Sequence, residues 1–263
     1  MSIITHGGEM SLAPTVRSVI AKTGQSLRQV LHRLANYQFD AIQLDATLSG
    51  LRPRDLDHRA RQDVLALLNR SNFRLSGMDL FIPRDHYLAT EHLDRAMQAT
   101  LASIELAADF GRIPLSIALP IQQMADDTKT ALIESAEGHS VRLAVHAEDQ
   151  LDELIAWVEQ VDLPTVGCGL DPAAILSKAA DPAALVHRIG RRLSVARLSD
   201  ASSRDAIRCP IGQGDLDVST YRIAVDLAAH RTGPVVLDLR GHEDPLNTAL
   251  DSRLAWDDAG FKV

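Results

Sequence analysis

Apolar positions along the chain alternate between two patterns. Short apolar runs, typical of buried strands, are separated by longer segments in which apolar residues recur every three or four positions, as on one face of a helix. The expected strands cover residues 16–21 (or alternatively 2–5), 41–45, 75–81, 114–119, 141–146, 164–170, 193–198 and 234–239. The expected helices cover 26–36, 55–70, 91–110, 122–137, 149–161, 182–190, 219–230 and 246–256.

About eight strand–helix units therefore span the 263 residues. Strands separated by helices pair in parallel through right-handed crossovers, and eight units in roughly 250 residues match an α/β (β/α)8 TIM barrel. A doubly wound open sheet is the alternative, but its dinucleotide-binding version needs a glycine-rich turn after the first strand, and no such turn is present. No linker-like or low-complexity segment divides residues 1–263, so we expect a single domain.

Side chains alternate between the two faces of a strand, so each expected strand can be divided into an apolar set facing the helices and a second set facing the barrel interior. The interior set ends in His146, Asp171, Arg197 and Asp238 on four consecutive strands. Each of these residues lies near the carboxyl end of its strand, where barrel enzymes place their catalytic groups. Any one of these residues could instead be an ordinary polar strand end that is solvated at the barrel mouth. Four of them in matching positions favour a functional site.

Further candidates share this interior position or lie close to it. Asp45 and Asp79 end the second and third strands, Glu148 follows the fifth, and Arg240 follows the eighth. The loop from Gly212 to Asp217 could cradle a phosphate, although Asp217 is also placed to cap the next helix.

Charge and composition restrict the class of partner. The net charge is −8 and aromatic residues are 4% of the chain, so neither a basic nucleic-acid surface nor an aromatic sugar groove is expected. No apolar run is long enough to span a membrane, no signal-peptide pattern is present, and two cysteines do not make a disulfide framework. We expect a cytoplasmic protein that acts on a small molecule, and assembly into a homo-oligomer is left open.

Several of these segments resemble the xylose isomerase-like barrel superfamily, which contains sugar and sugar-phosphate isomerases and epimerases and a branch of apurinic endonucleases. The similar segments are Phe39-Asp-Ala-Ile-Gln-Leu-Asp45 (GFDGVEL in the family), Leu143-Ala-Val-His-Ala147 (LxLEN), Leu170-Asp-Pro-Ala-Ala174 (DxxH), Val195-Ala-Arg-Leu-Ser-Asp200 (VHLKD), Ile211-Gly-Gln-Gly-Asp-Leu-Asp217 (GxGxxD) and Val236-Leu-Asp-Leu239 (the final metal-glutamate strand). Their order and spacing carry the resemblance over most of the chain.

The resemblance implies a divalent cation, commonly Mn or Mg, held by Glu, Asp, His and Glu, and proton transfer by two glutamates. By position, His146 stands for the first Glu, Asp171 for the Asp, Arg197 for the His and Asp238 for the last Glu. Only Asp171 is unchanged, and the substrate-contacting His of the DxxH turn is Ala174. If a metal is bound (Mn, Mg or Zn), His146, Asp171 and Asp238 are the expected ligands, with Glu148 as a further candidate.

Arg197 changes this expectation most. A guanidinium stays protonated and has no lone pair to offer a metal. Its natural partners are Asp171 and Asp238, so we expect the guanidinium to stand in the place of the metal, with no other cofactor.

Two functions follow. The first is an isomerase- or epimerase-like enzyme that moves a proton next to a carbonyl in a sugar or sugar phosphate, with Asp45, His146, Asp171 and Asp238 as catalytic candidates. Its substrate-binding candidates are Arg197, Arg240, Glu148 and Asp79. The second is a non-catalytic barrel that binds an anionic small molecule. Nuclease activity is disfavoured, because the cluster of metal-binding His and Glu residues of that branch is missing.

Overall fold

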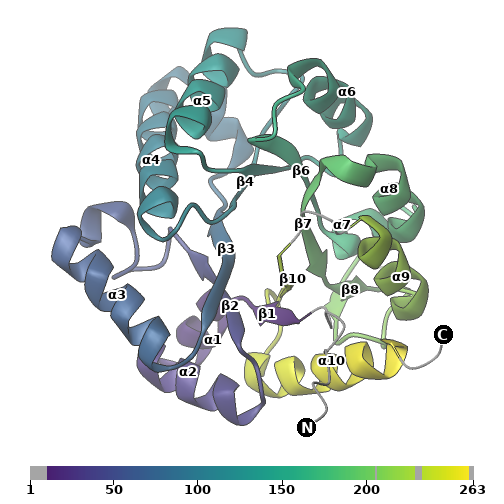
Figure 1. Ribbon diagram of the computed structural model, residues 1–263. Coiled ribbons are helices and arrows are strands. Elements are labelled where there is room, and N and C mark those ends of the chain that lie inside the picture. The colour runs from purple at the N-terminus through teal and green to yellow at the C-terminus, as the bar shows by residue number, and fades with distance from the viewer. Residues whose placement is uncertain (1–10, 205, 229–232, 261–263) are drawn as a thin grey trace, which may run out of the picture.

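The strands of the chain form one parallel barrel surrounded by helices (Figure 1). The computed structural model describes residues 11–204, 206–228 and 233–260. The barrel strands are β1 (Leu12–Pro14), β2 (Ala41–Asp45), β3 (Arg74–Leu80), β4 (Leu115–Ala118), β5 (Leu143–His146), β6 (Val166–Leu170), β7 (Leu193–Leu198) and β10 (Val235–Leu237). A two-stranded hairpin, β8 (Asp200–Ala201) and β9 (Arg208–Cys209), follows β7.

The helices are α1 (Val16–Thr23), α2 (Leu27–Asn36), α3 (His58–Arg70), α4 (Thr90–Asp109), α5 (Asp126–His139), α6 (Leu151–Val161), α7 (Pro172–Leu176), α8 (Pro182–Ile189), α9 (Val218–Ala228) and α10 (Pro245–Gly260). Short 3-10 turns are η1 (Pro53–Asp55), η2 (Arg84–Tyr87) and η3 (Gly190–Arg192). No helix in the described part of the chain is long and apolar enough to cross a membrane.

The eight barrel strands pair in the order β1-β10-β7-β6-β5-β4-β3-β2, all in parallel. A bridge between Thr15 and Gln43 joins the two ends of this series and nearly closes the ring. The predicted (β/α)8 barrel is therefore confirmed, and the carboxyl ends of all eight strands lie at one end, here called the barrel mouth.

The prediction of the first strand was wrong. Residues 16–21 lie in α1, and the strand is the three-residue segment Leu12–Pro14 just before it. Val16 and Val19 are buried three positions apart, as on a helix face, but an apolar run this short does not distinguish helix from strand. The alternative at 2–5 lies outside the described residues.

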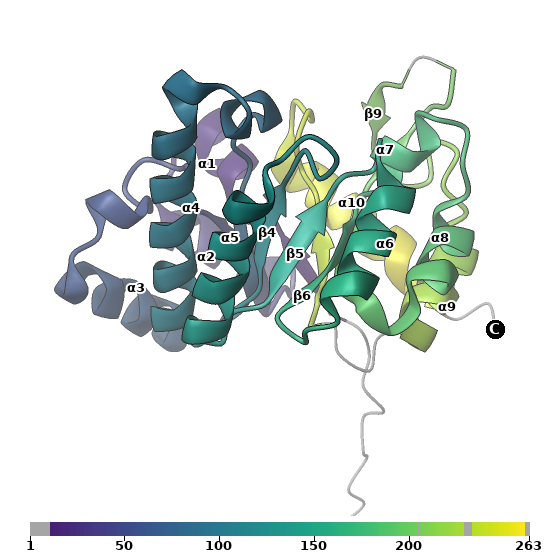
Figure 2. The same ribbon diagram turned by 90° about the horizontal axis from the view of Figure 1, so that it is seen from above.

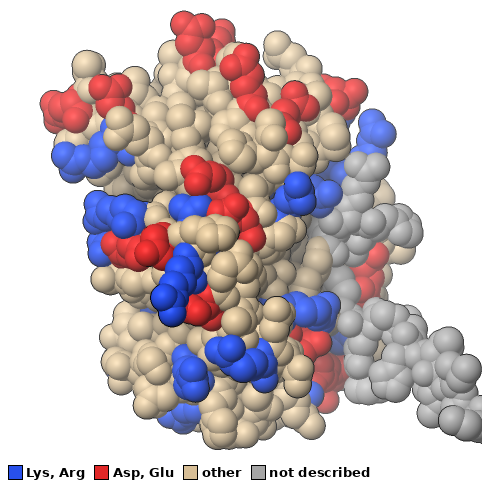
Figure 3. Space-filling view, turned by 60° about the vertical axis from the view of Figure 1, so that its left-hand side comes forward, with Lys and Arg blue, Asp and Glu red and all other residues tan. Residues whose placement is uncertain are grey.

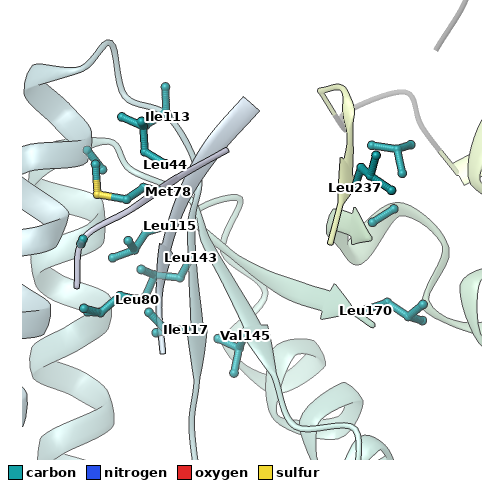
Figure 4. Packing of buried hydrophobic residues seen from close by; sticks show 14 of the residues in the cluster. Leu44, Met78, Leu80, Ile113, Leu115, Ile117, Leu143, Val145, Leu170 and Leu237 are labelled. Carbon is teal, nitrogen blue, oxygen red and sulfur yellow. The ribbon is translucent and has the colours of Figure 1, made fainter. Parts of the chain in front are cut away.

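Two apolar layers follow the predicted alternation of strand side chains. The outward set, which includes Leu44, Met78, Leu115, Leu143 and Leu237, packs between the strands and the helices (Figure 4). Inside the barrel, Ala144, Val195 and Val236 form a small separate cluster. Each member lies one interior position before His146, Arg197 or Asp238 along the chain, so those polar side chains form the next layer, at the barrel mouth.

Candidate functional site

Arg197 lies at the centre of the barrel mouth and is fully buried. It points inward from β7 because its neighbours Ala196 and Leu198 belong to the outward layer. Its Nη2 donates to Asp79 of β3, and its Nη1 donates to Asp238, after β10, at 3.2 Å. The prediction of Asp238 as a partner is confirmed, but the second partner is Asp79 rather than Asp171, because Asp79 reaches across the lumen from the opposite strand.

Asp171 pairs with two other arginines. Arg240 donates from Nη2 to Asp171 at 2.9 Å and from Nε to Asp238 at 2.9 Å. Arg208 contacts Asp171 through Nη2, and its Nη1 lies 3.4 Å from Asp238. We call these six residues the arginine–aspartate cluster: Arg197, Arg208, Arg240, Asp79, Asp171 and Asp238.

Sequence reasoning missed Arg208. It comes from β9 of the hairpin, which stands above the barrel at the carboxyl side (Figure 2), and the hairpin returns this side chain over the mouth. The hairpin strands are only two residues long, so no alternation marks them in the sequence. The one indication was the polar stretch after β7, which is long for a strand–helix connection.

Burial and charge oppose one another in this cluster. Burial disfavours ionisation of Asp238, but attraction to Arg197, Arg240 and Arg208 outweighs burial and holds the pKa of Asp238 well below its usual range. The pKa of Asp171 is lowered in the same way, against burial, chiefly by Arg208 and Arg240. For Asp79 burial prevails and raises the pKa, although Arg197 and a hydrogen bond from Gln43 at 2.8 Å favour the charged form.

His146 and Glu148 lie beside this cluster and form a hydrogen-bonded pair. His146 Nδ1 lies 2.8 Å from Glu148 Oε1, which also accepts the backbone N–H of Asp171 at 3.1 Å. An ionised carboxylate only accepts hydrogen bonds, so Nδ1 is the donor to it, and in the neutral imidazole Nε2 is then the nitrogen with the lone pair. Nε2 is buried and has no hydrogen-bond partner among the described residues.

The glycine at 169 makes room for this imidazole. A Cβ atom at Gly169 would lie only 2.2 Å from His146 Nε2. Since residue 169 faces the interior, the ring lies over β6 inside the lumen. The ring of Phe81 meets the imidazole edge-on with centroids 5.6 Å apart, and it also lies 5.0 Å from the Arg197 guanidinium carbon and 4.8 Å from that of Arg240.

Asp45 is buried at the mouth on the β2 side and has its own partners. Arg17 Nη1 lies 3.2 Å from Oδ2, and the backbone N–H of Thr47 donates to Oδ1 at 2.7 Å. The carboxylate thus caps the turn after β2 while forming an ion pair with α1. Its predicted role as a base stays a prediction.

The glycine loop after β9 binds a carboxylate of the chain itself. Asp200 accepts the backbone N–H groups of Gly212 at 2.9 Å, Gly214 at 3.0 Å and Leu216 at 3.0 Å. A Cβ atom at Gly214 would lie 2.2 Å from an Asp200 oxygen, which explains the glycine there. The loop donors that could cradle a phosphate are therefore occupied, while Asp217 caps α9 through Thr220 N at 3.0 Å, as predicted.

The side chains at the mouth do not fit the divalent cation that the sequence resemblance implies. Among the described residues, no group of three or more His, Cys, Asp and Glu side chains is arranged to hold a metal. The expected ligands Asp171 and Asp238 are both paired with arginines, whose charges would repel a cation.

Comparison with known proteins shows the family to which this chain belongs. The sequence model of the xylose isomerase-like TIM barrel family matches residues 31–258, which is most of the chain. This chain belongs to the xylose isomerase-like TIM barrel family. A search of curated proteins found no match.

Solved structures agree with this family on the fold. A xylose isomerase domain protein from Planctomyces limnophilus has a TM-score of 0.72 at 16% identity, with 95% of this chain and 96% of that chain covered. D-psicose 3-epimerase with D-tagatose from Clostridium cellulolyticum H10 has a TM-score of 0.73 at 13% identity, covering 96% and 99%. A xylose isomerase-like protein from Mycobacterium smegmatis in complex with magnesium has a TM-score of 0.71 at 15% identity, covering 95% and 96%.

Proposed function

We propose that this chain is a metal-independent isomerase- or epimerase-like enzyme that acts on a small polyhydroxylated, anionic molecule at the barrel mouth. The observation that carries the proposal is the cluster of three guanidinium groups around Asp171 and Asp238, which correspond to metal ligands of the family by the sequence resemblance. Fixed guanidinium groups can stabilise negative charge on a carbonyl oxygen, which is one task of the metal. Arg240 is the cluster arginine best placed to meet a ligand, since 39% of its side chain is exposed.

His146 is the proton-transfer group in this proposal. Nε2 is buried against β6 in this structure, so the proposal requires the imidazole to turn toward the mouth. Nε2 would then take the proton from the carbon next to the carbonyl while the electron pair of the broken C–H bond moves to the carbonyl oxygen. Protonation of that carbon from the opposite face by water gives an epimer, with the abstracted proton released from His146 to solvent. Return of the proton to the former carbonyl carbon, together with transfer of the hydroxyl proton from one oxygen to the other, gives an isomer. Glu148 would orient the ring and stabilise the imidazolium.

A second candidate is a non-catalytic barrel that binds an anionic small molecule. A specific observation favours it: Asp79, Asp171 and Asp238 each pair with an arginine, so none of the three is a free base. In this alternative, ligand binding stabilises the barrel without exchange of any carbon-bound proton.

Solvent exchange distinguishes the two functions. A panel of aldoses, ketoses, sugar phosphates and aldonates would be incubated with the protein in D₂O with excess EDTA. Deuterium incorporation next to the carbonyl would be followed by NMR. The proposal expects incorporation that survives the chelator and falls about 100-fold or more in His146→Asn. Ligand-induced thermal stabilisation without incorporation would support the binding protein, and incorporation that needs added Mn²⁺ would overturn metal independence.

A further inference from the structure

A cavity of about 530 Å³ lies beside the barrel mouth, outside the arginine–aspartate cluster. Its walls are α4 and the segments that follow β2 and β3. On α4 the lining positions 95, 99 and 102 recur every three or four residues, so one helix face borders the space. Two of these three residues are alanines, and this lack of side-chain volume contributes to the cavity.

The packing of α3 leaves this face of α4 uncovered. Arg61 of α3 binds Glu105 of α4 at 2.9 Å and contacts Asp109 one turn further on. Both partners lie in the carboxyl-terminal half of α4, and the amino-terminal half instead faces residues 52–54 across the cavity.

The cavity lining is mainly apolar but carries only basic charge. Three arginines (Arg52, Arg54 and Arg95) and His86 line it, and no Asp or Glu does. This is unusual for a chain of net charge −8, whose outer face shows acidic and basic side chains interspersed (Figure 3). Arg52 is neutralised from outside the lining by Asp55 at 2.7 Å.

Arg95 differs from Arg52. It is exposed to solvent beside this mainly apolar space, and it forms no hydrogen bond or ion pair with the part of the chain that the structure describes. A guanidinium in this setting is well suited to bind an incoming carboxylate or sulfonate, because such a bond is charge-assisted and often bidentate.

We infer that this cavity is a binding site for a small aromatic anion. The apolar walls, with Phe81 and Pro83 among them, take the ring, and Arg95 binds the anionic group. Phe81 also contacts Arg197, Arg240 and His146 at the barrel mouth, so an occupant of the cavity would touch a residue shared by both sites. The inference goes beyond the proposed function and requires no catalysis.

Two fluorescent probes test it on the full chain. 1-Anilinonaphthalene-8-sulfonate is an aromatic anion that fluoresces in apolar surroundings, and N-phenyl-1-naphthylamine is its neutral counterpart. The inference expects saturable binding of the anion at one site, weakened about 10-fold in Arg95→Gln, with the neutral probe unaffected by that change. The matched control is Arg59→Gln, an exposed helix arginine of α3 outside the cavity lining, which should leave both probes unchanged.

A second variant tests whether the probes bind in the cavity, whereas Arg95→Gln tests the contribution of the charge. Ala99→Phe fills the cavity and should abolish saturable binding of both probes, while circular dichroism and the melting temperature report whether the fold is kept. Equal binding of the anion to wild type, Arg95→Gln and a folded Ala99→Phe variant would overturn the inference, and so would the absence of saturable binding to wild type. None of these readouts involves metal or turnover, so failure here leaves the proposed function intact.

Discussion

The barrel mouth and the α4 cavity both gather arginines, but in opposite electrostatic settings. At the mouth, Arg197, Arg208 and Arg240 face three carboxylates, and the charges balance within the cluster. At the cavity, Arg95 is exposed to solvent beside mainly apolar walls and has no acidic partner among the described residues. Balanced buried charges hold the strands together, whereas an unbalanced guanidinium retains its capacity to bind an external anion.

The largest effect is expected when the centre of the cluster is removed. Arg197→Leu leaves Asp79 buried without its ion-pair partner and takes one of three arginines from Asp238. Breaking one side of a buried ion pair costs about 3–5 kcal/mol, to be measured by denaturant unfolding. Adding Asp79→Asn removes the orphaned charge and should restore at least about 1 kcal/mol; a loss below about 1 kcal/mol in the single variant would contradict the structural role of Arg197.

The second-largest effect is expected on acidification, which should lower the stability that the cluster gives to the fold. The pKa values of Asp171 and Asp238 are lowered in the folded chain, so their stabilisation is present above the ordinary carboxyl pKa and is lost as the pH falls toward their folded values. Asp79, whose pKa is raised, works in the opposite direction, because its burial favours the protonated form. Asp171 and Asp238 together outweigh Asp79, so we expect the free energy of unfolding to decrease as the pH falls from about 5 to 3.

Asp238→Asn isolates one of these groups. It should reduce the acid slope of the free energy of unfolding by up to about 1.4 kcal/mol per pH unit, the limit for one proton. The slope is measured by unfolding the variant at several pH values. If the dependence of the free energy of unfolding on pH is unchanged, the arginines do not hold Asp238 in its charged form.

A smaller effect is expected at the solvent side of the cluster. Arg240 is partly exposed, so water screens its bonds to Asp171 and Asp238. Arg240→Gln should lower the free energy of unfolding by about 1 kcal/mol, clearly less than Arg197→Leu. If Arg240→Gln and Arg197→Leu lower the free energy of unfolding equally, the buried centre of the cluster and its exposed edge do not differ in stability.

The smallest effect is expected at the cavity. Arg95→Gln should change the free energy of unfolding by less than about 0.5 kcal/mol, because the guanidinium has no partner among the described residues to lose. A loss above about 1 kcal/mol would indicate a structural contact and weaken the contrast between the two groups of arginines.

Side-chain alternation predicted the barrel and several site positions because it depends only on local geometry. Ile42 and Leu44 face the helices, and the intervening Gln43 binds Asp79 in the lumen. The same reasoning placed Arg197 inside the barrel. Arg197 pairs with Asp79 rather than Asp171 because of distances across the lumen, and the spacing of residues in the sequence does not give those distances.

The contributions of loops could not be predicted in the same way. Arg208 reaches the cluster only because a short hairpin folds back over the mouth, and Asp200 occupies the glycine loop only because β7 ends beside it. The α4 cavity lies between α4 and the segments after β2 and β3, and helix periodicity does not predict how those segments pack.

The central claim is that arginine cations at the barrel mouth take the place of the divalent cation that the sequence resemblance implies. The most direct measurement is the metal content of chain purified without chelator and then dialysed against excess Mn²⁺, with Arg197→His as the matched variant. We predict less than about 0.1 Mn²⁺ per wild-type chain, because the cluster carboxylates are already neutralised. Stoichiometric Mn²⁺ in the wild type, released by Asp171→Asn or Asp238→Asn, would contradict the account.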